Sequence, residues 1–390
     1  MKYPFTPDFL DALPERLADL FRDFELIILT DICRRLKKEN EEENVTVQFL
    51  LSLIFFGVDI SYISRVISEE TEIAVSKLNE IFDDVISQNK SYYESLMELV
   101  ELETSELVSD SEIQDIIRET ETTCQEAVEK SVFIVDNGRT TVKPENAYRW
   151  AVNNAILQVQ SGETDYNKAI QNAVKQLADS GLKVITYSSG HVDQIDVAVR
   201  RAVITGVNQL CQKYADEASK YLNTDYVEVS AHSGARDKPG PTPWYSHKDW
   251  QGRIYSFKSG DKYPSIYTSC GLGYVDGLLG ANCRHHYSPF IDGVMQRTYT
   301  DEQLEHIDDG KGCTYQGRTY SAYEATQKQR QIERTIRKLK RQRAAYQAAG
   351  LKDEEQTSNI RLKRLEKEYK KFSKAAGLPE QTERTQIYEK

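Results

Sequence analysis

Imidazole and thiol side chains, which often serve in metal binding and nucleophilic catalysis, gather in residues 227–294 of this 390-residue chain. Glycine, proline and aromatic residues are also concentrated there, whereas long charge-rich segments with helical periodicity lie on both sides. Four of the six histidines and two of the six cysteines fall within this stretch: His232, His247, His285, His286, Cys270 and Cys283. We therefore expect the rest of the chain to be organised around it.

One interpretation of this stretch is a zinc site whose ligands are His232, His247, Cys283 and His285. Imidazole nitrogen and thiolate sulfur are ligand atoms that zinc prefers in proteins. The spacing does not match a familiar zinc finger, because the pair Cys283-x-His285 is closer than the usual ligand pairs. We therefore expect no cofactor and keep zinc as the alternative.

A second interpretation is a cysteine hydrolase in which Cys283 is the nucleophile and His232 or His247 is the general base. Such a site needs the base within hydrogen-bonding reach of the thiol and a third group that orients the base. Asp237 or Asp249 could supply that third group, but no local protease signature surrounds the cysteine. Catalysis is therefore the less favoured expectation.

The third interpretation, which we favour, is a hydrogen-bonded polar core that fixes the loop geometry. Arginine donors can satisfy loop carbonyls, and tryptophans more often pack in a core or an interface than around a ligand. The glycines of residues 271–280 match neither the G-x-G-x-x-G dinucleotide-binding motif nor the P-loop motif. They more simply permit positive φ angles in a tight loop. The residues assigned to this polar core are His232, Gly234, Arg236, His247, Trp250, Gly252, Asn282, Cys283, Arg284 and His285.

Three short blocks in this stretch resemble the phage minor capsid protein 2 family, which is distantly similar to the Mu-F-like head morphogenesis proteins. The blocks are His232-Ser233-Gly234-Ala235-Arg236, His247-x-x-Trp250-Gln251-Gly252 and Gly280-x-Asn282-Cys283-Arg284-His285, followed by Pro289-Phe290. The resemblance covers about residues 148–294 and is weak or absent in the first hundred residues and in the tail. It implies a minor structural protein of a tailed-phage head that acts by docking.

The resemblance also implies where the protein works and with what. The expected location is the virion, at the portal vertex or capsid interior, with the host cytoplasm during assembly. The expected partners are the portal or other head proteins; the basic tail adds packaged DNA as a candidate partner, and the acidic first third of a neighbouring copy adds self-association. The expected work is head assembly and DNA packaging or ejection, and the rival is a metal- or cysteine-dependent hydrolase carried in the virion.

The segment from Lys328 to Lys374 is strongly basic, although the chain as a whole has a formal net charge of -11. Such a net charge argues against a general nucleic-acid binder, so any DNA contact would be local. A solvated helix face, or a face docked on acidic protein, is the commoner reason for such a segment. The candidates for contacts with DNA phosphates are Lys338, Lys340, Arg341, Lys363 and Arg364.

The expected fold class is α+β, predominantly helical, with a small central β-containing, loop-rich module flanked by helical regions. We divide the chain into an acidic helical region, a helical region leading into the module, the module, and a basic helical tail, at residues 1–130, 131–225, 226–320 and 321–390. Apolar residues at helical spacing support the helices, and alternation supports strands at 227–230 and 253–257.

Several local patterns predict where elements begin and end. Asn44 or Thr46 could cap a helix, and Ser111-x-x-Gln114 fits a capping box. A long amphipathic helix is expected over 192–222, and two basic helices over 321–349 and 354–376 should form a hairpin or coiled coil.

Membrane insertion and disulfide bonding are not expected. The longest apolar run, residues 49–58, is too short to span a bilayer, and the N-terminus has no apolar signal-peptide region. The six cysteines are scattered without a C-x-x-C motif, which is typical of synthesis in a reducing cytosol.

Overall fold

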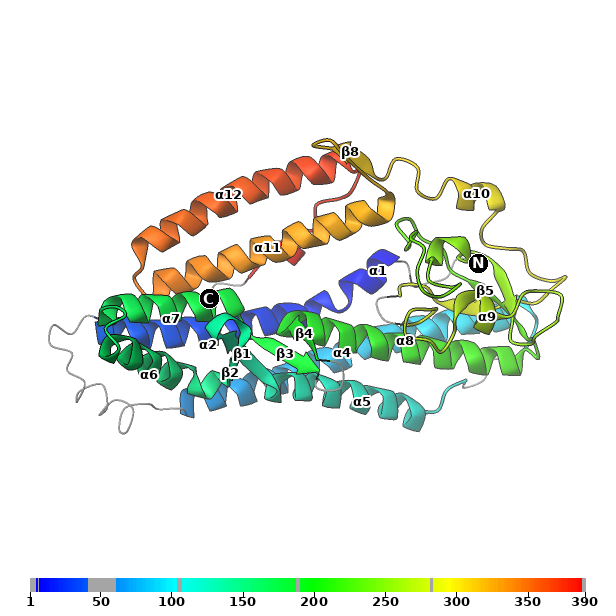
Figure 1. Cartoon of the computed structure of the whole chain (residues 1–390). Helices are drawn as coiled ribbons and strands as arrows, with labels where there is room; N and C mark the ends of the chain where they lie inside the picture. Colours follow the sequence, from blue (N-terminus) through cyan, green and yellow to red (C-terminus); the bar gives the residue numbers. More distant parts are fainter. Residues whose placement is uncertain are drawn as a thin grey trace.

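A computed structural model describes Phe5 and residues 7–40, 61–103, 107–186, 190–280 and 283–387. Long helices dominate these residues, and small antiparallel sheets lie among them (Figure 1). The predicted fold class is therefore confirmed. Two predictions lie outside the described residues: the helix capped near Asn44 or Thr46, and the role of Asn282.

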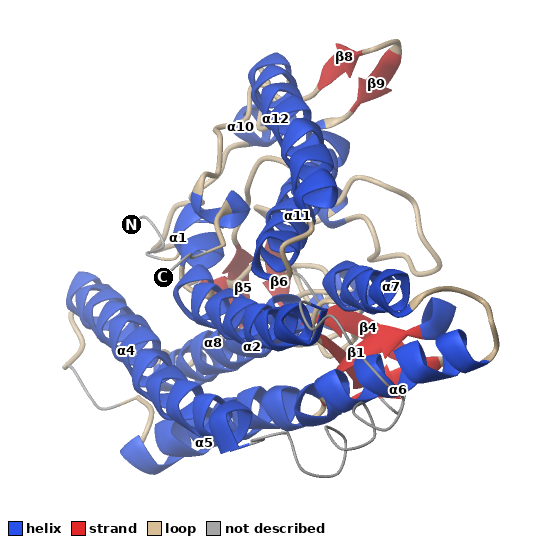
Figure 2. Cartoon of the chain, turned by 90° about the vertical axis from the view of Figure 1, so that its left-hand side faces the viewer, coloured by secondary structure: helices blue, strands red, loops and turns tan. Residues whose placement is uncertain are grey.

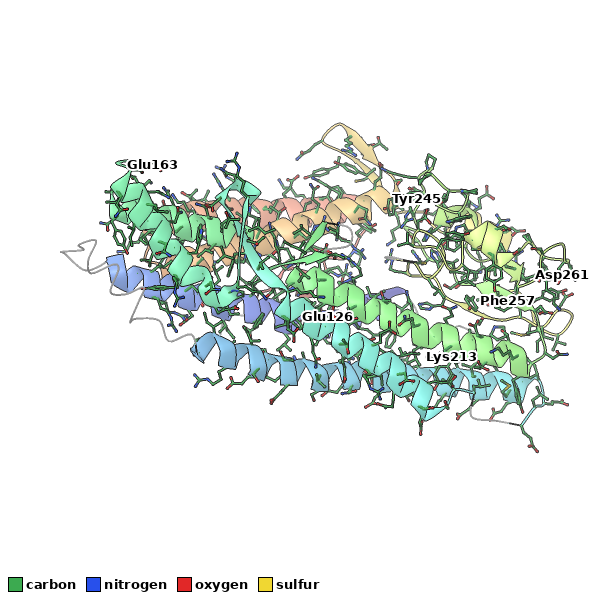
Figure 3. The ribbon with its side chains drawn as sticks, turned by 60° about the horizontal axis from the view of Figure 1, so that its bottom comes forward. Glu126, Glu163, Lys213, Tyr245, Phe257 and Asp261 are labelled. Carbon is green, nitrogen blue, oxygen red and sulfur yellow. The ribbon has the colours of Figure 1, made fainter. Side chains whose placement is uncertain are left out.

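The long helices give the molecule its elongated frame. They are α2 (Glu15–Asn40), α4 (Ser61–Leu99), α5 (Asp110–Glu129), α8 (Ile195–Tyr221), α11 (Ala322–Ala348) and α12 (Lys352–Ala375). The shorter helices are α1 (Pro7–Ala12), α6 (Ala147–Gln160), α7 (Tyr166–Ser180), α9 (Ile266–Cys270) and α10 (Asp301–Glu305). Helices α2, α4, α5 and α8 pack against one another along the frame, each burying one apolar face (Figures 1 and 3).

The capping box of α5 is made by Ser109 and Glu112, so the prediction that it lies at Ser111 and Gln114 is wrong by two residues. The Ser109 side chain accepts the backbone N–H of Glu112, and the Glu112 carboxylate accepts the N–H of Ser109. A carboxylate is the better partner at a helix N-terminus, because it also interacts favourably with the helix dipole.

A four-stranded sheet with the order β2-β1-β3-β4 lies beside the helical frame, and α7 packs on it (Figure 2). Its strands are β1 (Ser131–Val135), β2 (Thr140–Val142), β3 (Lys183–Thr186) and β4 (His191–Gln194). Residues 191–194 pair with β3, so α8 begins at Ile195 and the predicted start of this helix is three residues too early.

The central module is built on a second sheet with the order β6-β5-β7: β5 (Tyr226–Val229), β6 (Ile254–Ser256) and β7 (Tyr287–Pro289). The two predicted strands are β5 and β6, whereas β7 was missed because it is short and contains a proline. Pro289 is tolerated since β7 is an edge strand, where one missing N–H leaves no ladder partner unpaired.

The tail forms the predicted helical hairpin, in which α11 and α12 pack along their length. Gly350 joins them with a φ of +71°, which a side chain would disfavour. A short β-hairpin, β8 (Cys313–Tyr315) and β9 (Arg318–Tyr320), covers the open end of this hairpin. Helix α11 lies against α2 and α7, while α12 is the outer helix (Figure 1).

One continuous hydrophobic core extends from the N-terminal helices into the module, and it includes Leu17, Phe82, Val203, Val227 and Cys283. The module is therefore packed onto the frame, and the boundaries between the four predicted regions stay a prediction. Among the described helices, none combines the length and the apolarity needed to cross a membrane.

Candidate functional site

The three blocks singled out in the sequence meet inside the module, which forms one end of the elongated molecule. Figure 3 shows Tyr245, Phe257 and Asp261 at this end and Glu163 at the opposite end. Strand β5 leads directly into the loop that carries His232, and the segment before β7 carries His285. The sheet thus brings together loops that are distant in the sequence.

Aromatic rings form the wall of this site. The His232 ring is stacked on the His285 ring with centroids 4.4 Å apart, and the His247 ring lies 4.6 Å from Trp250. Trp250 and His247 meet His285 edge-on, at 4.9 and 5.4 Å. All four side chains are buried, so they form a compact cluster away from solvent.

Three of the four candidate metal ligands converge within this cluster. His247, Cys283 and His285 each present one ligand atom, and these atoms all lie within 4.8 Å of one another. The Cys283 Sγ lies 3.6 Å from the Nδ1 of His285 and 3.4 Å from its backbone nitrogen. His232 is stacked beside them but does not belong to this group of three.

Hydrogen bonds on the outer side of the rings fix which nitrogen carries the proton. The Nε2 of His285 lies 3.1 Å from the Oε1 of Gln251, and that oxygen also accepts the backbone N–H of His232 at 3.0 Å. The Nε2 of His247 lies 3.1 Å from the carbonyl oxygen of Asp276. Because these oxygens only accept, both Nε2 atoms donate and the lone pair of each neutral ring is on Nδ1.

Burial keeps the cluster uncharged. It lowers the pKa of His247 to about 4 and the pKa of His285 well below its usual value, where the neighbouring His232 adds to the effect. Burial also raises the pKa of the Cys283 thiol, although the hydrogen bond from the backbone N–H of His285 acts to lower it. Without a metal ion, the groups are therefore neutral imidazoles beside a protonated thiol.

The surroundings of Cys283 differ from those of an activated cysteine nucleophile. An activated cysteine needs a lowered pKa and access for a substrate, whereas the Cys283 side chain is buried and its pKa is raised. A ring nitrogen of His232 hydrogen-bonds to the backbone carbonyl of Ser233, and a ring nitrogen of His247 to that of Asp276. Asp249, one of the proposed orienting residues, is exposed.

Asp276 supports the site, and the sequence analysis missed it. Its carboxylate accepts hydrogen bonds from the hydroxyl of Thr242 at 2.7 Å and from the indole of Trp244 at 2.9 Å. Its carbonyl oxygen accepts from Arg236 at 3.2 Å as well as from His247. These hydrogen bonds lower the pKa of Asp276, and they bind the proline-rich loop to the segment before Cys283.

Asp308 is the second supporting carboxylate that the sequence analysis missed. It accepts the backbone N–H of Gly234 at 2.8 Å, the hydroxyl of Ser233 at 3.1 Å and the ammonium of Lys248 at 2.7 Å. It therefore joins the first block to the second. No local pattern marks Asp276 or Asp308, because an aspartate in a polar loop is common.

The remaining members of the predicted polar core are Trp250, Arg236, Gly252 and Arg284. The Trp250 indole donates to the carbonyl of Trp244 at 2.8 Å, and the guanidinium of Arg236 lies 4.5 Å from the centre of the Tyr245 ring. Gly252 has a φ of +68°, and a Cβ there would lie 2.4 Å from a methyl group of Leu304. Arg284 is half-buried.

The basic tail divides into an inner helix and an outer helix. Arg341 on α11 is buried and donates to both carboxylate oxygens of Glu25, at 3.2 and 3.1 Å, which removes it as a contact for DNA. Lys338 is paired with Asp179 at 3.0 Å, and Lys340 is half-buried. Lys363 and Arg364 on α12 are exposed, so for these two a DNA contact stays a prediction.

A layer of buried ion pairs joins α11 and the C-terminal segment to α2 and α8. Arg22 pairs with Glu15 at 2.6 Å and with Asp196 at 3.2 Å, and Arg337 pairs with the same oxygen of Asp196 at 3.2 Å. Burial raises the pKa of Asp196, but Arg337 and Arg22 outweigh it and hold the pKa below its usual value. The acidic partners of Arg337 and Arg341 on α11 are therefore supplied by the same chain.

Comparisons with known proteins identify the same family that the three blocks resemble. A family model described as Phage minor capsid protein 2 matches residues 5–374. The match includes the first hundred residues and most of the tail, so the expectation that the resemblance fades there is wrong. No solved structure matches the chain.

Two curated relatives bear the name structural protein. The one from Lactococcus phage LL-H is 26% identical over 212 residues, which cover 52% of this chain and 51% of the relative. The one from Lactococcus phage mv4 is 32% identical over 113 residues, which cover 28% of this chain and 80% of the relative. The matched part thus spans about half the length of the first relative.

Proposed function

The chain belongs to the phage minor capsid protein 2 family, and from this premise we propose that it is a minor structural component of a tailed-phage head, placed at the portal vertex or in the capsid interior. The observation that carries the proposal is the match over residues 5–374. In this role the protein acts by docking on other head proteins and by facing the packaged DNA.

A rigid, internally tied framework supports a docking role. The same hydrophobic core joins the module to the helical frame, and the buried ion pairs join the tail to that frame. The module nevertheless exposes large apolar side chains, at 47, 56, 75 and 64% for Tyr267, Tyr274, Val275 and Val294. Exposed apolar groups of this kind are suited to contact with a protein partner.

Complementation of a phage that lacks this gene tests the docking role. We expect Val275→Asp/Val294→Asp to reduce the yield of filled, infectious heads by at least tenfold, while the purified variant keeps its thermal midpoint. Ile73→Asp on α4, at a side chain that is 45% exposed, is the matched control and should complement normally. Full complementation by a variant that has lost the whole module would contradict the proposal.

The outer face of α12 supports an orientation toward DNA. Seven basic residues of this helix are exposed: Arg361, Lys363, Arg364, Lys367, Lys370, Lys371 and Lys374. Only two acidic residues occur in the same stretch, Glu366 and Glu368, and both are half-buried. Within the described part of the chain, the ion pairs between side chains use none of the seven. This face is therefore available to the phosphates of a nucleic acid, which it would contact without reading sequence.

Salt-dependent binding of the full chain to double-stranded DNA tests this orientation. Each phosphate contact should add about -0.9 to the slope of log K against log salt. Changing Lys363, Arg364, Lys367 and Lys370 to Gln should flatten that slope by about 3 or more. The control removes the same charge at exposed lysines elsewhere, Lys130, Lys220, Lys258 and Lys262. Equal slopes for the two variants would contradict a DNA-facing α12.

A further inference from the structure

We propose that His247, Cys283 and His285 form a structural zinc site that fastens the loops of the module to one another. The proposal does not depend on the role of the protein in the phage head. It rests on the geometry of three buried side chains from two separate loops, on the hydrogen bonds around them, and on the ligand chemistry of zinc.

The separations between the ligand atoms fit a zinc ion. With a zinc–sulfur distance of about 2.3 Å and a zinc–nitrogen distance of about 2.0 Å, tetrahedral geometry places the sulfur and the nitrogen about 3.5 Å apart. The Cys283 Sγ and the His285 Nδ1 lie 3.6 Å apart. All three ligand atoms lie within 4.8 Å of one another, so shifts of about 1 Å in side-chain position would bring each of them to bonding distance from one zinc ion.

The hydrogen bonds around the cluster match those that metal ligands require. A histidine that binds a metal commonly donates its other ring N–H to a carbonyl or carboxylate oxygen. His285 donates from Nε2 to Gln251, which leaves the lone pair on the Nδ1 that faces the thiol, and His247 donates from Nε2 to the Asp276 carbonyl. The backbone N–H of His285 points to the Cys283 sulfur at 3.4 Å, where it would stabilise a thiolate.

The position of the cluster indicates a structural site. His247, Cys283 and His285 are only 3, 1 and 1% exposed, so a substrate has no access to an ion held by them. His247 comes from the loop between β5 and β6, whereas Cys283 and His285 come from the segment before β7. An ion held by both would lock the two loops together, and the fourth position is open to His232 or to a water molecule.

Metal analysis of the purified full-length chain tests the proposal. We expect close to one zinc per chain, removal by a strong chelator with a fall in the thermal midpoint, and recovery of the midpoint when zinc alone is added. Cobalt should replace zinc and give the visible bands of a tetrahedral ion together with a thiolate-to-cobalt charge-transfer band. Substoichiometric metal, with no change in the midpoint on chelation or zinc addition, would overturn the proposal.

Two cysteine variants assign the ligand. Cys283→Ser should weaken zinc binding by at least tenfold and abolish the charge-transfer band. Cys270→Ser is the matched control, because Cys270 is equally buried in the same module but lies outside the group of three ligands. Zinc binding that is lost in Cys270→Ser and kept in Cys283→Ser would overturn the assignment. If Cys283→Ser does not fold, the charge-transfer band of the unmodified chain decides, since its absence excludes a thiolate ligand.

Discussion

Two polar regions are buried in this protein: a charged layer of ion-paired side chains, within which burial raises the pKa of Glu25, and a neutral cluster of imidazole rings and a thiol. The layer between α11 and the frame consists of guanidinium and carboxylate groups at ion-pair distance. The cluster in the module consists of imidazole rings and a thiol whose pKa values burial shifts toward the uncharged forms. The difference matters because only neutral imidazoles have a free lone pair for a metal ion.

The two regions also join the chain in different ways. In the charged layer, Arg341 meets Glu25 across 316 residues, so the fold alone brings the partners together. In the neutral cluster, the ligand residues are spread over a much shorter stretch of one module. We infer that the charged layer holds the tail to the frame, whereas the neutral cluster sets the internal geometry of the module.

The largest expected effect is at Glu25, because its removal leaves Arg341 as a buried charge without its carboxylate. Glu25→Ala should lower the free energy of unfolding by about 3–5 kcal/mol, as measured by urea denaturation. The double variant Glu25→Met/Arg341→Met should lose less than Glu25→Ala, since it leaves no buried charge. A double variant as unstable as the single one would show that the charge itself is not the cause.

The neutral cluster should respond to metal where the charged layer does not. If free zinc exceeds the dissociation constant about a hundredfold, zinc should stabilise the folded chain by about 2.7 kcal/mol. A chelator should remove this stability from the unmodified chain and from Glu25→Ala alike, but not from Cys283→Ser. Equal responses of all three proteins would remove the distinction between the two regions.

The charged layer should in turn respond to acid. The pKa of Asp196 lies below its usual value of 3.8, so the unfolded chain binds a proton there at a pH at which the folded chain does not. This contribution to stability is present above pH 3.8 and is lost as the pH falls through the folded pKa. Asp196→Asn should therefore show a shallower loss of stability below about pH 4 than the unmodified chain. Parallel curves would contradict this account.

The smallest expected effect lies at the exposed rim of the same layer. Lys338 pairs with Asp179, but both side chains are about half-exposed, so solvent screens the pair. Lys338→Ala should change the free energy of unfolding by about 0–1 kcal/mol. A loss comparable to that of Glu25→Ala would mean that burial does not separate the inner pairs from the outer ones.

The sequence predicted the elements whose pattern is local. Alternating apolar residues marked β5 and β6, and helical spacing with Gly350 marked the two tail helices. It also identified the residue types of the neutral cluster, because four of the six histidines gather in residues 227–294 together with Cys270 and Cys283. It did not reveal which of those residues meet, since the approach of His247 to Cys283 depends on a sheet whose third strand, β7, has no alternating pattern.

The supporting groups and the charge partners were also beyond the reach of sequence patterns. Asp276 and Asp308 act through backbone N–H and carbonyl groups and side chains that approach only in the folded module. The acidic first region and the basic tail were both visible in the sequence. The sequence did not show that Asp196 and Arg337 would meet within one chain, because charge alone does not specify a partner.

The most direct test of the central contrast is anomalous X-ray scattering at the zinc absorption edge from crystals of the full-length protein. We predict one peak at ligand distance from the Cys283 Sγ and the His285 Nδ1, and no peak in the layer around Asp196. A module without a peak, in which the thiol and the ring still lie at hydrogen-bonding distance, would contradict the metal site and leave a polar core in its place.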